Sequence, residues 1–252
     1  MLACEGLDVR VAGRCLVRSL SAGFEPGTLV AVLGRNGVGK TLTLHTLAGL
    51  RPPSAGTVTL DGRALAEWPR GALARRLSLL PQSVEDPFPT TVLETALIGR
   101  HPHLGFWQWE GPGDLDLARR ALAEVDLGGF EARELDTLSG GERRRLAVAT
   151  LLAQDPAACL LDEPTNHLDP APQHAVLEVF RRRADAGGVV LASLHDATLA
   201  ARYAHRALLL YGDGRWEYGD CAEVLTPAAL TALYGSPVAE LAWQGRRVFV
   251  GA

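Results

Sequence analysis

Two glycine-containing segments, about a hundred residues apart, have the composition of phosphate-binding sites. The first is Gly34-Arg35-Asn36-Gly37-Val38-Gly39-Lys40-Thr41, which fits the spacing Gly-x4-Gly-Lys-Thr. In such a loop the glycines let successive backbone N–H groups face phosphate oxygens. Lys40 would reach the β- and γ-phosphates, and Thr41 would offer its hydroxyl to Mg²⁺. The segment therefore predicts a site for a nucleotide and Mg²⁺.

The second segment is Leu138-Ser139-Gly140-Gly141-Glu142, which precedes the helix-like run 142–153. It combines a hydroxyl, two flexible glycines and a helix N-terminus, a combination that favours an anion. One chain thus carries two separate phosphate-binding segments. This arrangement predicts a nucleotide held between two copies of the protein.

Two carboxylates follow the apolar run 158–161. Asp162 can hold Mg²⁺ through water, as the acidic partner of a phosphate loop does. Glu163 comes one residue later, where it can orient or deprotonate an attacking water. Two acids at a strand end can also be ordinary solvated termini, but the phosphate loop upstream favours the functional interpretation.

Two more polar residues end apolar strands. His195 follows the run 190–194, where it is interpreted as a sensor of the γ-phosphate rather than as a hydrogen-bonded structural histidine. Gln82 follows the strand that ends at Leu80-Pro81, and it is predicted to touch Mg²⁺ and the attacking water. Taken alone, a glutamine at a strand end is a weak signal.

The elements around these residues predict an α/β protein. Leu29–Leu33 reads as a buried strand that runs into the phosphate loop, and residues 41–50 read as the helix after it. The remaining expected elements are short strands in 1–30, a hairpin, short helix and strand in 54–82, helices at 114–127 and 142–153, strands at 158–162, 189–194 and 207–211, and a helix at 226–235 capped by Thr226-Pro227. Residues 86–150 are expected to form a mostly helical insertion in this core.

Composition excludes several classes of protein. The 252 residues are 47% hydrophobic with a net charge of −4, so a full core is expected and a nucleic-acid partner is not. The triplets Arg143–Arg145 and Arg181–Arg183 fall in helical patterns and are interpreted as solvated faces. Lys40 is the only lysine, which makes it an unusual residue to find in a glycine-rich loop by chance.

The cysteines and the apolar segments give further expectations. The four cysteines form no Cys-x-x-Cys pair, so we interpret them as reduced thiols without a metal. Residues 1–5 lack the pattern of a secretory signal, and no apolar run approaches the ~18–20 residues of a spanning helix. We therefore expect any membrane-embedded part to belong to a partner.

The ordered set of motifs resembles the ATP-binding subunit of an ABC transporter. The set is Gly34–Thr41 (Walker A), Gln82 (Q-loop), Leu138–Glu142 (signature), Leu161–Thr165 (Walker B), Leu168-Asp169 (D-loop) and His195 (H-loop). The resemblance implies a P-loop NTPase with a RecA-like core, an N-terminal antiparallel β subdomain and a helical insertion carrying the signature. It implies one domain over 1–252, with the core in about 1–85 and 151–235, the helical subdomain in 86–150 and a tail in 236–252.

The resemblance also assigns roles. Residues Gly34, Arg35, Asn36, Gly37, Val38, Gly39, Lys40 and Thr41 would wrap the phosphates of ATP, and Thr41, Gln82 and Asp162 would hold Mg²⁺. Glu163 would be the catalytic base, with His195 on the γ-phosphate and Gln82 on the attacking water. Ser139, Gly140 and Gly141 would close over ATP on the opposite subunit, and Asp169 would cross the interface of a homodimer. Val11 lies where the family stacks an aromatic residue on adenine, so Val11 or the stem of Arg14 would pack there instead.

Three further segments resemble ATPases of importers for metal chelates: Ile98–Gly105, His195–Arg206 and Ala222–Gly235. Membership of that group implies a peripheral protein on the cytoplasmic face of the inner membrane. It also implies a permease dimer as partner, a substrate-binding protein acting indirectly, and a corrinoid, haem or ferric chelate as cargo. Phe106, Trp107 and Trp109, in the proline- and aromatic-rich region 86–109, would then contact the permease or, alternatively, pack on the helical insertion.

Two other functions remain open on the sequence. The first is a soluble ABC ATPase that acts on ribosomes, DNA or cluster assembly. Translation-type members usually carry two cassettes and DNA-repair members carry long coiled coils or zinc pairs, whereas this sequence has one cassette and neither of the other features. The second is a phosphate-loop kinase outside the ABC family, which Leu138–Glu142 disfavours. Acceptor-independent phosphate release would separate an ATPase from a kinase.

Overall fold

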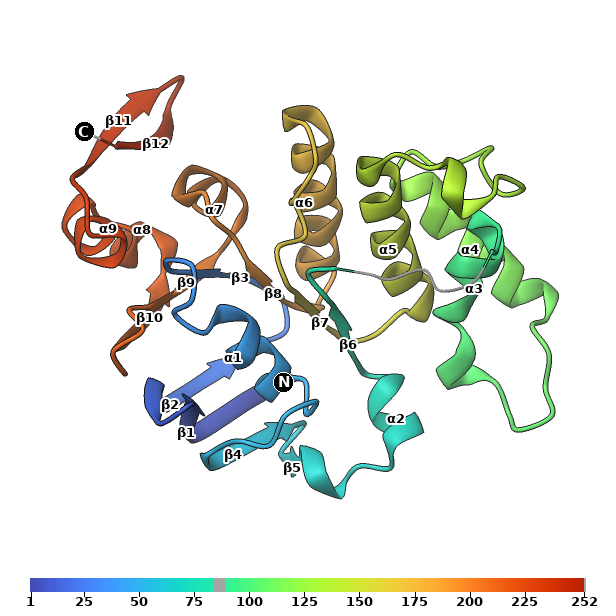
Figure 1. Cartoon of the computed structure of the whole chain (residues 1–252), viewed down its shortest axis with the longest axis horizontal. Coiled ribbons are helices and arrows are strands. Elements are labelled where there is room, and N and C mark those ends of the chain that lie inside the picture. Colours follow the sequence, from blue (N-terminus) through green and yellow to red (C-terminus); the bar gives the residue numbers. More distant parts are fainter. Residues whose placement is uncertain (84–88, 252) are drawn as a thin grey trace.

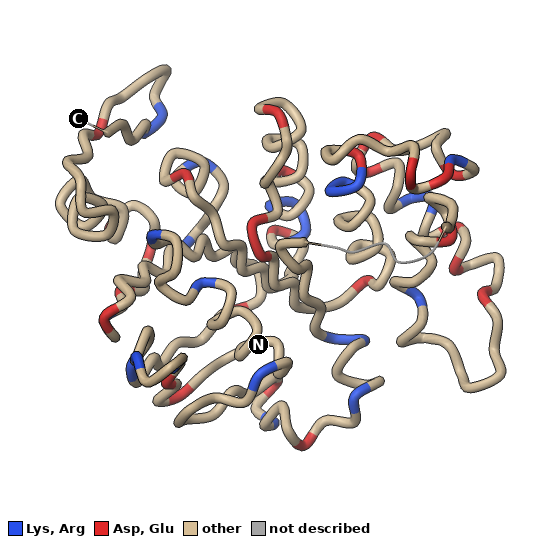
Figure 2. Tube along the Cα trace, viewed as in Figure 1, with Lys and Arg blue, Asp and Glu red and all other residues tan. Residues whose placement is uncertain are grey.

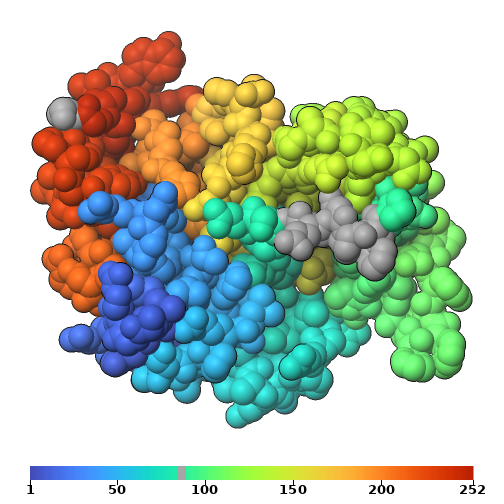
Figure 3. Space-filling model, viewed as in Figure 1, coloured from blue at the N-terminus to red at the C-terminus, as the bar shows by residue number. Residues whose placement is uncertain are grey.

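The computed structural model describes residues 1–83 and 89–251. Within them a central sheet carries an antiparallel sheet on one side and a group of helices on the other (Figure 1). The space-filling view separates the same parts, with the helical group in green and yellow-green and the N-terminal part in blue and cyan (Figure 3). The start of the expected helical insertion, within residues 84–88, lies outside the described residues.

The central sheet brings the ends of its parallel strands to one edge. In spatial order its strands are β10 (Trp216–Asp220), β9 (Arg206–Leu210), β3 (Thr28–Leu33), β8 (Val189–Ser193), β7 (Ala158–Leu161) and β6 (Leu77–Leu80). All neighbouring pairs are parallel except β10 and β9. Parallel strands covered on both faces read as continuous apolar runs, which is why these segments stand out in the sequence.

The antiparallel sheet and helix α1 (Lys40–Leu47) cover one face of the central sheet. The antiparallel sheet has the order β2 (Arg14–Phe24), β1 (Leu2–Val11), β4 (Ala55–Leu60) and β5 (Arg63–Ala64). Leu44 of α1 shares one buried cluster with Phe24 of β2 and with Val30 of β3. The phosphate loop is thereby fixed at both ends, by β3 before it and by α1 after it.

The opposite face of β3, with Leu29 and Leu33, belongs to a second buried cluster. Helix α6 (Pro170–Asp185) contributes Leu177 and Phe180 to it, both fully buried. The helical layer, which we define as α3 (Val92–Ile98), α4 (Pro112–Glu124) and α5 (Gly140–Gln154), joins the same cluster. The layer is therefore packed onto the sheet by shared apolar surface.

Hydrogen bonds also stabilise the helical layer internally. The buried Arg100 side chain donates from Nε to Asp114 at 2.8 Å and from Nη1 to the carbonyl of Ala153 at 2.8 Å. Helix α3 begins with a capping box between Thr91 and Glu94. The sequence patterns placed helices close to α4 and α5 but none at α3.

The C-terminal region contains short helices and a hairpin. These elements are α7 (Ala197–Tyr203), α8 (Cys221–Val224), α9 (Pro227–Tyr234), β11 (Val238–Trp243) and β12 (Arg246–Gly251). Thr226 caps α9, because its hydroxyl accepts from the N–H of Ala229 at 3.1 Å. The hairpin lies inside the stretch 236–252 that was expected as a tail, and Phe249 of β12 bonds to Thr198 of α7. Remaining short helices are α2 (Arg70–Ala74), η1 (Leu65–Glu67), η2 (His101–His103) and η3 (Leu135–Thr137).

Charged residues of both signs are spread over the described chain (Figure 2). Figure 2 shows that positively and negatively charged residues are interspersed along the sheets and the helical layer of the described chain. Among the helices of residues 1–83 and 89–251, none combines the length and the apolar character that crossing a bilayer requires.

Candidate active site

The phosphate loop connects the end of β3 to the start of α1. Gly39, the residue before α1, has φ +105°, a conformation that residues with a Cβ rarely adopt. A Cβ on Gly34 would lie 2.5 Å from the carbonyl oxygen of Leu210, so no side chain fits there. Arg35, Asn36 and Gly37 form the exposed crest of the loop.

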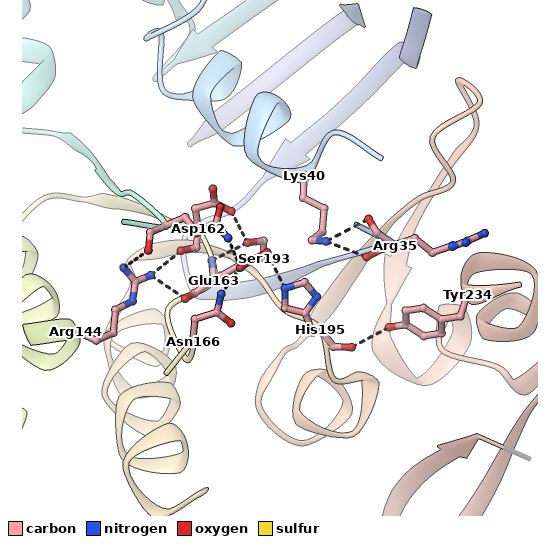
Figure 4. A network of polar contacts seen from close by, with 11 residues as sticks. Arg35, Lys40, Arg144, Asp162, Glu163, Asn166, Ser193, His195 and Tyr234 are labelled. Carbon is pink, nitrogen blue, oxygen red and sulfur yellow. Dashed lines mark hydrogen bonds and ion pairs between the residues drawn. The ribbon is translucent and has the colours of Figure 1, made fainter. Parts of the chain in front are cut away.

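Lys40 is 6% exposed and points back over the loop (Figure 4). Its Nζ donates to the carbonyl oxygens of Gly34 at 2.9 Å and of Arg35 at 3.4 Å. Burial lowers the pKa of Lys40 from that of an ordinary lysine, and the negative charges of Glu163 and Asp162 partly oppose this shift. The ammonium group is therefore available for a phosphate at the place where the sequence predicts one.

Asp162 follows β7 and is fully buried. Its Oδ1 accepts a hydrogen bond from the hydroxyl of Ser193 at 2.7 Å. Its Oδ2 has no hydrogen-bond partner among the described residues. Buried polar atoms are nearly always paired, so this oxygen fits a ligand, and a hydrated Mg²⁺ matches its chemistry.

Glu163 is 7% exposed and collects contacts from three other segments (Figure 4). Its Oε1 lies 2.6 Å from Nε2 of His195, and its Oε2 accepts from Nε2 of Gln82 at 2.8 Å. Oε2 also accepts from the side-chain amide of Asn166. The Glu163 backbone N–H donates to Ser193 Oγ at 2.8 Å. The structure thus brings Gln82, Glu163 and His195 together.

The backbone of Glu163 is strained. Its φ is +49°, in the left-handed region that costs a residue with a side chain about 1–3 kcal/mol. Such strain persists only where surrounding contacts hold it. Here it lies at the residue interpreted as the base, the second residue beyond the end of β7.

Arg144 of α5 is buried beside this site. The side chain is 6% exposed, and it donates to five backbone carbonyl oxygens, those of Pro81, Gln82, Asp162, Glu163 and Pro164. Burial lowers the pKa of Arg144 to about 10, which leaves the guanidinium charged near neutral pH. The interpretation of the triplet 143–145 as a solvated face is wrong for Arg144, because its helix position faces the strand ends.

The signature segment forms the start of α5. Ser139 caps α5: its Oγ accepts from the N–H of Glu142 at 3.2 Å, and its own N–H donates to Glu142 Oε2 at 2.7 Å. No hydrogen bond between described residues joins Ser139, Gly140 or Gly141 to Lys40 or Glu163. Asp169 is exposed at the start of α6, and its side chain makes no capping bond.

Several residues of the site were not singled out in the sequence. Ser193 is the polar residue of the otherwise apolar β8, a signal that was available. Asn166 lies three residues after Glu163, between the Walker B motif and the D-loop. Tyr234 of α9 donates to the carbonyl of His195 at 3.3 Å, a contact across a long stretch of chain that no local pattern indicates.

Val11 and Arg14 pair at the exposed end of the hairpin β1–β2. The same hairpin approaches the phosphate loop, since a Cβ on Gly39 would lie 3.0 Å from Leu16 of β2. Val11 and Arg14 therefore belong to the hairpin that borders the phosphate loop.

A family model described as ABC transporter matches residues 17–166. The chain belongs to the ABC transporter family. Membership makes it an ATP-binding and ATP-hydrolysing transporter subunit, and it agrees with the resemblance found in the motifs.

Relatives in this family cover almost the whole chain. The hemin import ATP-binding protein of Pseudomonas entomophila is 42% identical over 243 residues, covering 94% of this chain and 94% of the relative. That of Myxococcus xanthus is 43% identical over 252 residues, covering 97% and 93%.

Solved structures share the fold. A chain of a transporter described as an inward-facing ABC transporter of the metal-chelate type is 27% identical, with a TM-score of 0.86, covering 100% of this chain and 97% of that one. A nucleotide-free ATP-binding cassette from an ABC transporter is 18% identical, with a TM-score of 0.79, covering 92% and 98%. The α/β P-loop fold expected from the sequence is thus confirmed.

Proposed function

We propose that this ABC ATPase energises the import of a metal chelate, with haem as the first candidate among haem, corrinoids and ferric siderophores. The observation that carries the proposal is the similarity, over nearly the full length, to ATPases named for hemin import. The structural likeness to a metal-chelate type transporter supports the same class of cargo. The cargo itself would be selected by a permease and a substrate-binding protein.

The site residues would divide the work of hydrolysis. The loop Gly34–Thr41 binds the phosphates, and Lys40 exchanges its carbonyl contacts for the β- and γ-phosphate oxygens. Mg²⁺, held by Thr41, Gln82 and Asp162, would neutralise charge on the phosphates when bound. Glu163 accepts the proton of the attacking water, and His195 donates to the γ-phosphate.

This division of work requires a rearrangement. Gln82 and His195 both contact Glu163 in the present structure, so they must part from it when water and the γ-phosphate enter. The carboxylate of Glu163 thereby stays bonded to Gln82 and His195 until ATP is bound. This restraint would limit hydrolysis to the loaded site.

A second copy of the chain would complete the site. Among the described residues, Ser139, Gly140 and Gly141 make no hydrogen bond to their own chain's Lys40 or Glu163, and the N-terminus of α5 favours an anion. In a head-to-tail homodimer these residues would bind the ATP of the opposite subunit, and Asp169 would cross the interface. Hydrolysis would then depend on closure of two subunits over two ATP molecules.

The permease contact is proposed at the helical layer. Phe106, Trp107 and Trp109 are 93%, 89% and 86% exposed, which is unusual for large apolar side chains and typical of a partner surface. A cavity of about 570 Å³ between β6, α3 and α5 is lined in part by Gln82. A permease segment in that cavity would touch the residue that bonds to Glu163, at the cytoplasmic face of the inner membrane.

The test is recovery of the assembled transporter. The tagged chain is purified from detergent-solubilised native membranes, and the associated proteins are identified by mass spectrometry. Co-purification of a polytopic permease supports transport, whereas recovery of soluble proteins alone favours an ABC ATPase outside transport. The recovered complex in proteoliposomes, with its binding protein, should then show ATPase activity stimulated by haem more than by cobalamin or a ferric siderophore. Stimulation by another chelate alone overturns haem as cargo.

A further inference from the structure

Arg144 joins the helical layer to the ends of two central strands. Nη1 donates to the carbonyls of Pro81 at 2.6 Å and Gln82 at 3.3 Å, just beyond β6. Nη2 donates to those of Asp162 at 2.6 Å and Glu163 at 2.7 Å, just beyond β7. Nε donates to Pro164 at 3.3 Å. All three nitrogens of one buried side chain are therefore used on the two segments that carry Gln82 and Glu163.

The chemistry of this contact is specific to arginine. A guanidinium presents five N–H donors in one rigid plane, whereas a lysine presents a single point charge. The acceptors here are backbone carbonyls, so the contact fixes the path of the chain. A buried cation needs such partners to offset its loss of water.

One feature of Glu163 depends on this geometry. In an extended strand, successive carbonyls point to opposite sides. The carbonyls of Asp162 and Glu163, which flank the rotatable bonds of Glu163, instead meet the same Nη2 atom. That convergence goes with the left-handed φ of +49° at Glu163. The guanidinium therefore bridges the two ends of the strained turn.

We propose that Arg144 is a positioning residue for ATP hydrolysis, which holds the backbone of Glu163 in its left-handed turn and keeps Gln82 in register with it. The inference rests on the proposed role of Glu163 as the base. Because Arg144 belongs to α5, the geometry of the base is tied to the placement of the helical layer against the sheet. A tilt of that layer moves the guanidinium and the two strand ends relative to one another.

The neighbouring residue supplies a matched control. Arg145 is also on α5, and its Nη1 donates to the carbonyls of Val125 at 2.9 Å and Asp126 at 3.0 Å. These contacts lie inside the helical layer and do not reach the strand ends. Loss of Arg145 therefore removes carbonyl contacts from the same helix without touching the turn at Glu163.

The experiment compares Arg144→Gln, Arg144→Lys and Arg145→Gln with the wild-type protein. We expect Arg144→Gln to lower kcat at saturating MgATP about 100-fold, since small displacements of a catalytic group have effects of this size, with the Kd for ATP nearly unchanged. Arg144→Lys should fall in between, and Arg145→Gln should keep its kcat. An Arg144→Gln protein with wild-type kcat, or an equal loss in Arg145→Gln, overturns the inference.

Glu163→Gln in the same series separates this inference from the proposed function. If Glu163→Gln hydrolyses ATP like the wild type, the assignment of the base fails. If it is inactive while Arg144→Gln is fully active, only the role of Arg144 fails.

Hydrogen exchange tests the turn without relying on turnover. The N–H groups of Glu163 and Asn166 are bonded to Ser193 and to the Glu163 carbonyl in the intact turn. Their exchange should accelerate about tenfold or more in Arg144→Gln, because the turn opens more often without the guanidinium. It should stay unchanged in Arg145→Gln. Unchanged exchange in both variants overturns the inference even in an inactive preparation.

Discussion

The Nε2 atom of His195 lies 2.6 Å from Oε1 of Glu163. The two side chains come from the ends of the adjacent strands β8 and β7, and each is proposed to act on the reacting centre of ATP. In the present structure they bind one another. The pair therefore has to separate for hydrolysis, and changes to either member have distinct expected effects.

Replacing Glu163 with Gln removes the proposed base while keeping the shape of the side chain. The variant should bind ATP with little change in Kd, lose kcat by at least about 100-fold, and accumulate as an ATP-bound dimer. Phosphate release and size-exclusion chromatography with MgATP measure the two properties. Glu67→Gln, at an exposed glutamate of η1, is the control and should behave as wild type. Wild-type turnover in Glu163→Gln would show that another group takes the proton.

The affinity for ATP should depend on pH through Lys40. Burial lowers its pKa in the free protein, and bound phosphates favour the charged form. Affinity is thus complete below the lowered pKa and declines as pH rises through it, by up to about tenfold per pH unit. The decline should begin below pH 10.5, the ordinary value for lysine. Binding titrations with ATP over a series of pH values measure it.

Two variants test this assignment. Lys40→Arg should abolish the decline, because arginine stays charged throughout. Lys40→Ala should lose most nucleotide affinity at every pH. Unchanged binding by Lys40→Ala would remove Gly34–Thr41 from the nucleotide site.

Ser193→Ala should destabilise the protein and slow hydrolysis together. The hydroxyl donates to Asp162 Oδ1 and accepts from the N–H of Glu163 in a fully buried position. Its loss leaves two buried polar groups unpaired, at a cost of about 1–3 kcal/mol in the free energy of unfolding. Denaturant unfolding and kcat measure the two effects. Ser54→Ala, at an exposed serine, should change neither, and a stable, fully active Ser193→Ala would contradict the role.

An aromatic residue at position 11 should tighten ATP binding. Val11 is 39% exposed at the end of the hairpin that borders the phosphate loop. Stacking of a base on an aromatic side chain contributes about 1–3 kcal/mol, so Val11→Trp should lower the Kd for ATP about fivefold or more. The Kd for tripolyphosphate, which has no base, should stay constant. Val11→Leu is the matched control, and equal gains for ATP and tripolyphosphate would place the base elsewhere.

The part of the site that lies at strand ends could be predicted from the sequence. Runs such as 158–161 and 190–194 are apolar because both sheet faces are covered, and each is followed at once by polar residues. Since parallel strands finish at a common edge, the sequence places Gln82, Glu163 and His195 at that edge. The strand order β8-β7-β6 that makes them neighbours comes from the structure. The phosphate loop could also be predicted, because its glycines are required by the local backbone conformation, such as the positive φ at Gly39.

Features set by contacts between distant segments could not be predicted in the same way. An arginine triplet looks the same whether it faces water or the ends of β6 and β7, so the burial of Arg144 was missed. Helix α3 lies in a stretch rich in proline and aromatic residues, although Thr91 and Glu94 gave its capping signal. The C-terminal hairpin turns at Gln244 and Gly245, both with positive φ. In the sequence a single glycine is only a weak indication of such a turn.

The lone lysine also has a practical consequence. Every amine-directed label or crosslinker has one side-chain target in these 252 residues, and that target is Lys40 in the phosphate loop. Acylation of Lys40, told apart from acylation of the Met1 α-amino group by peptide mass mapping of this chain, would therefore report how many of the phosphate loops are open at a given moment. Lys40 is therefore a natural labelling site for nucleotide occupancy, and no residue has to be introduced by mutation.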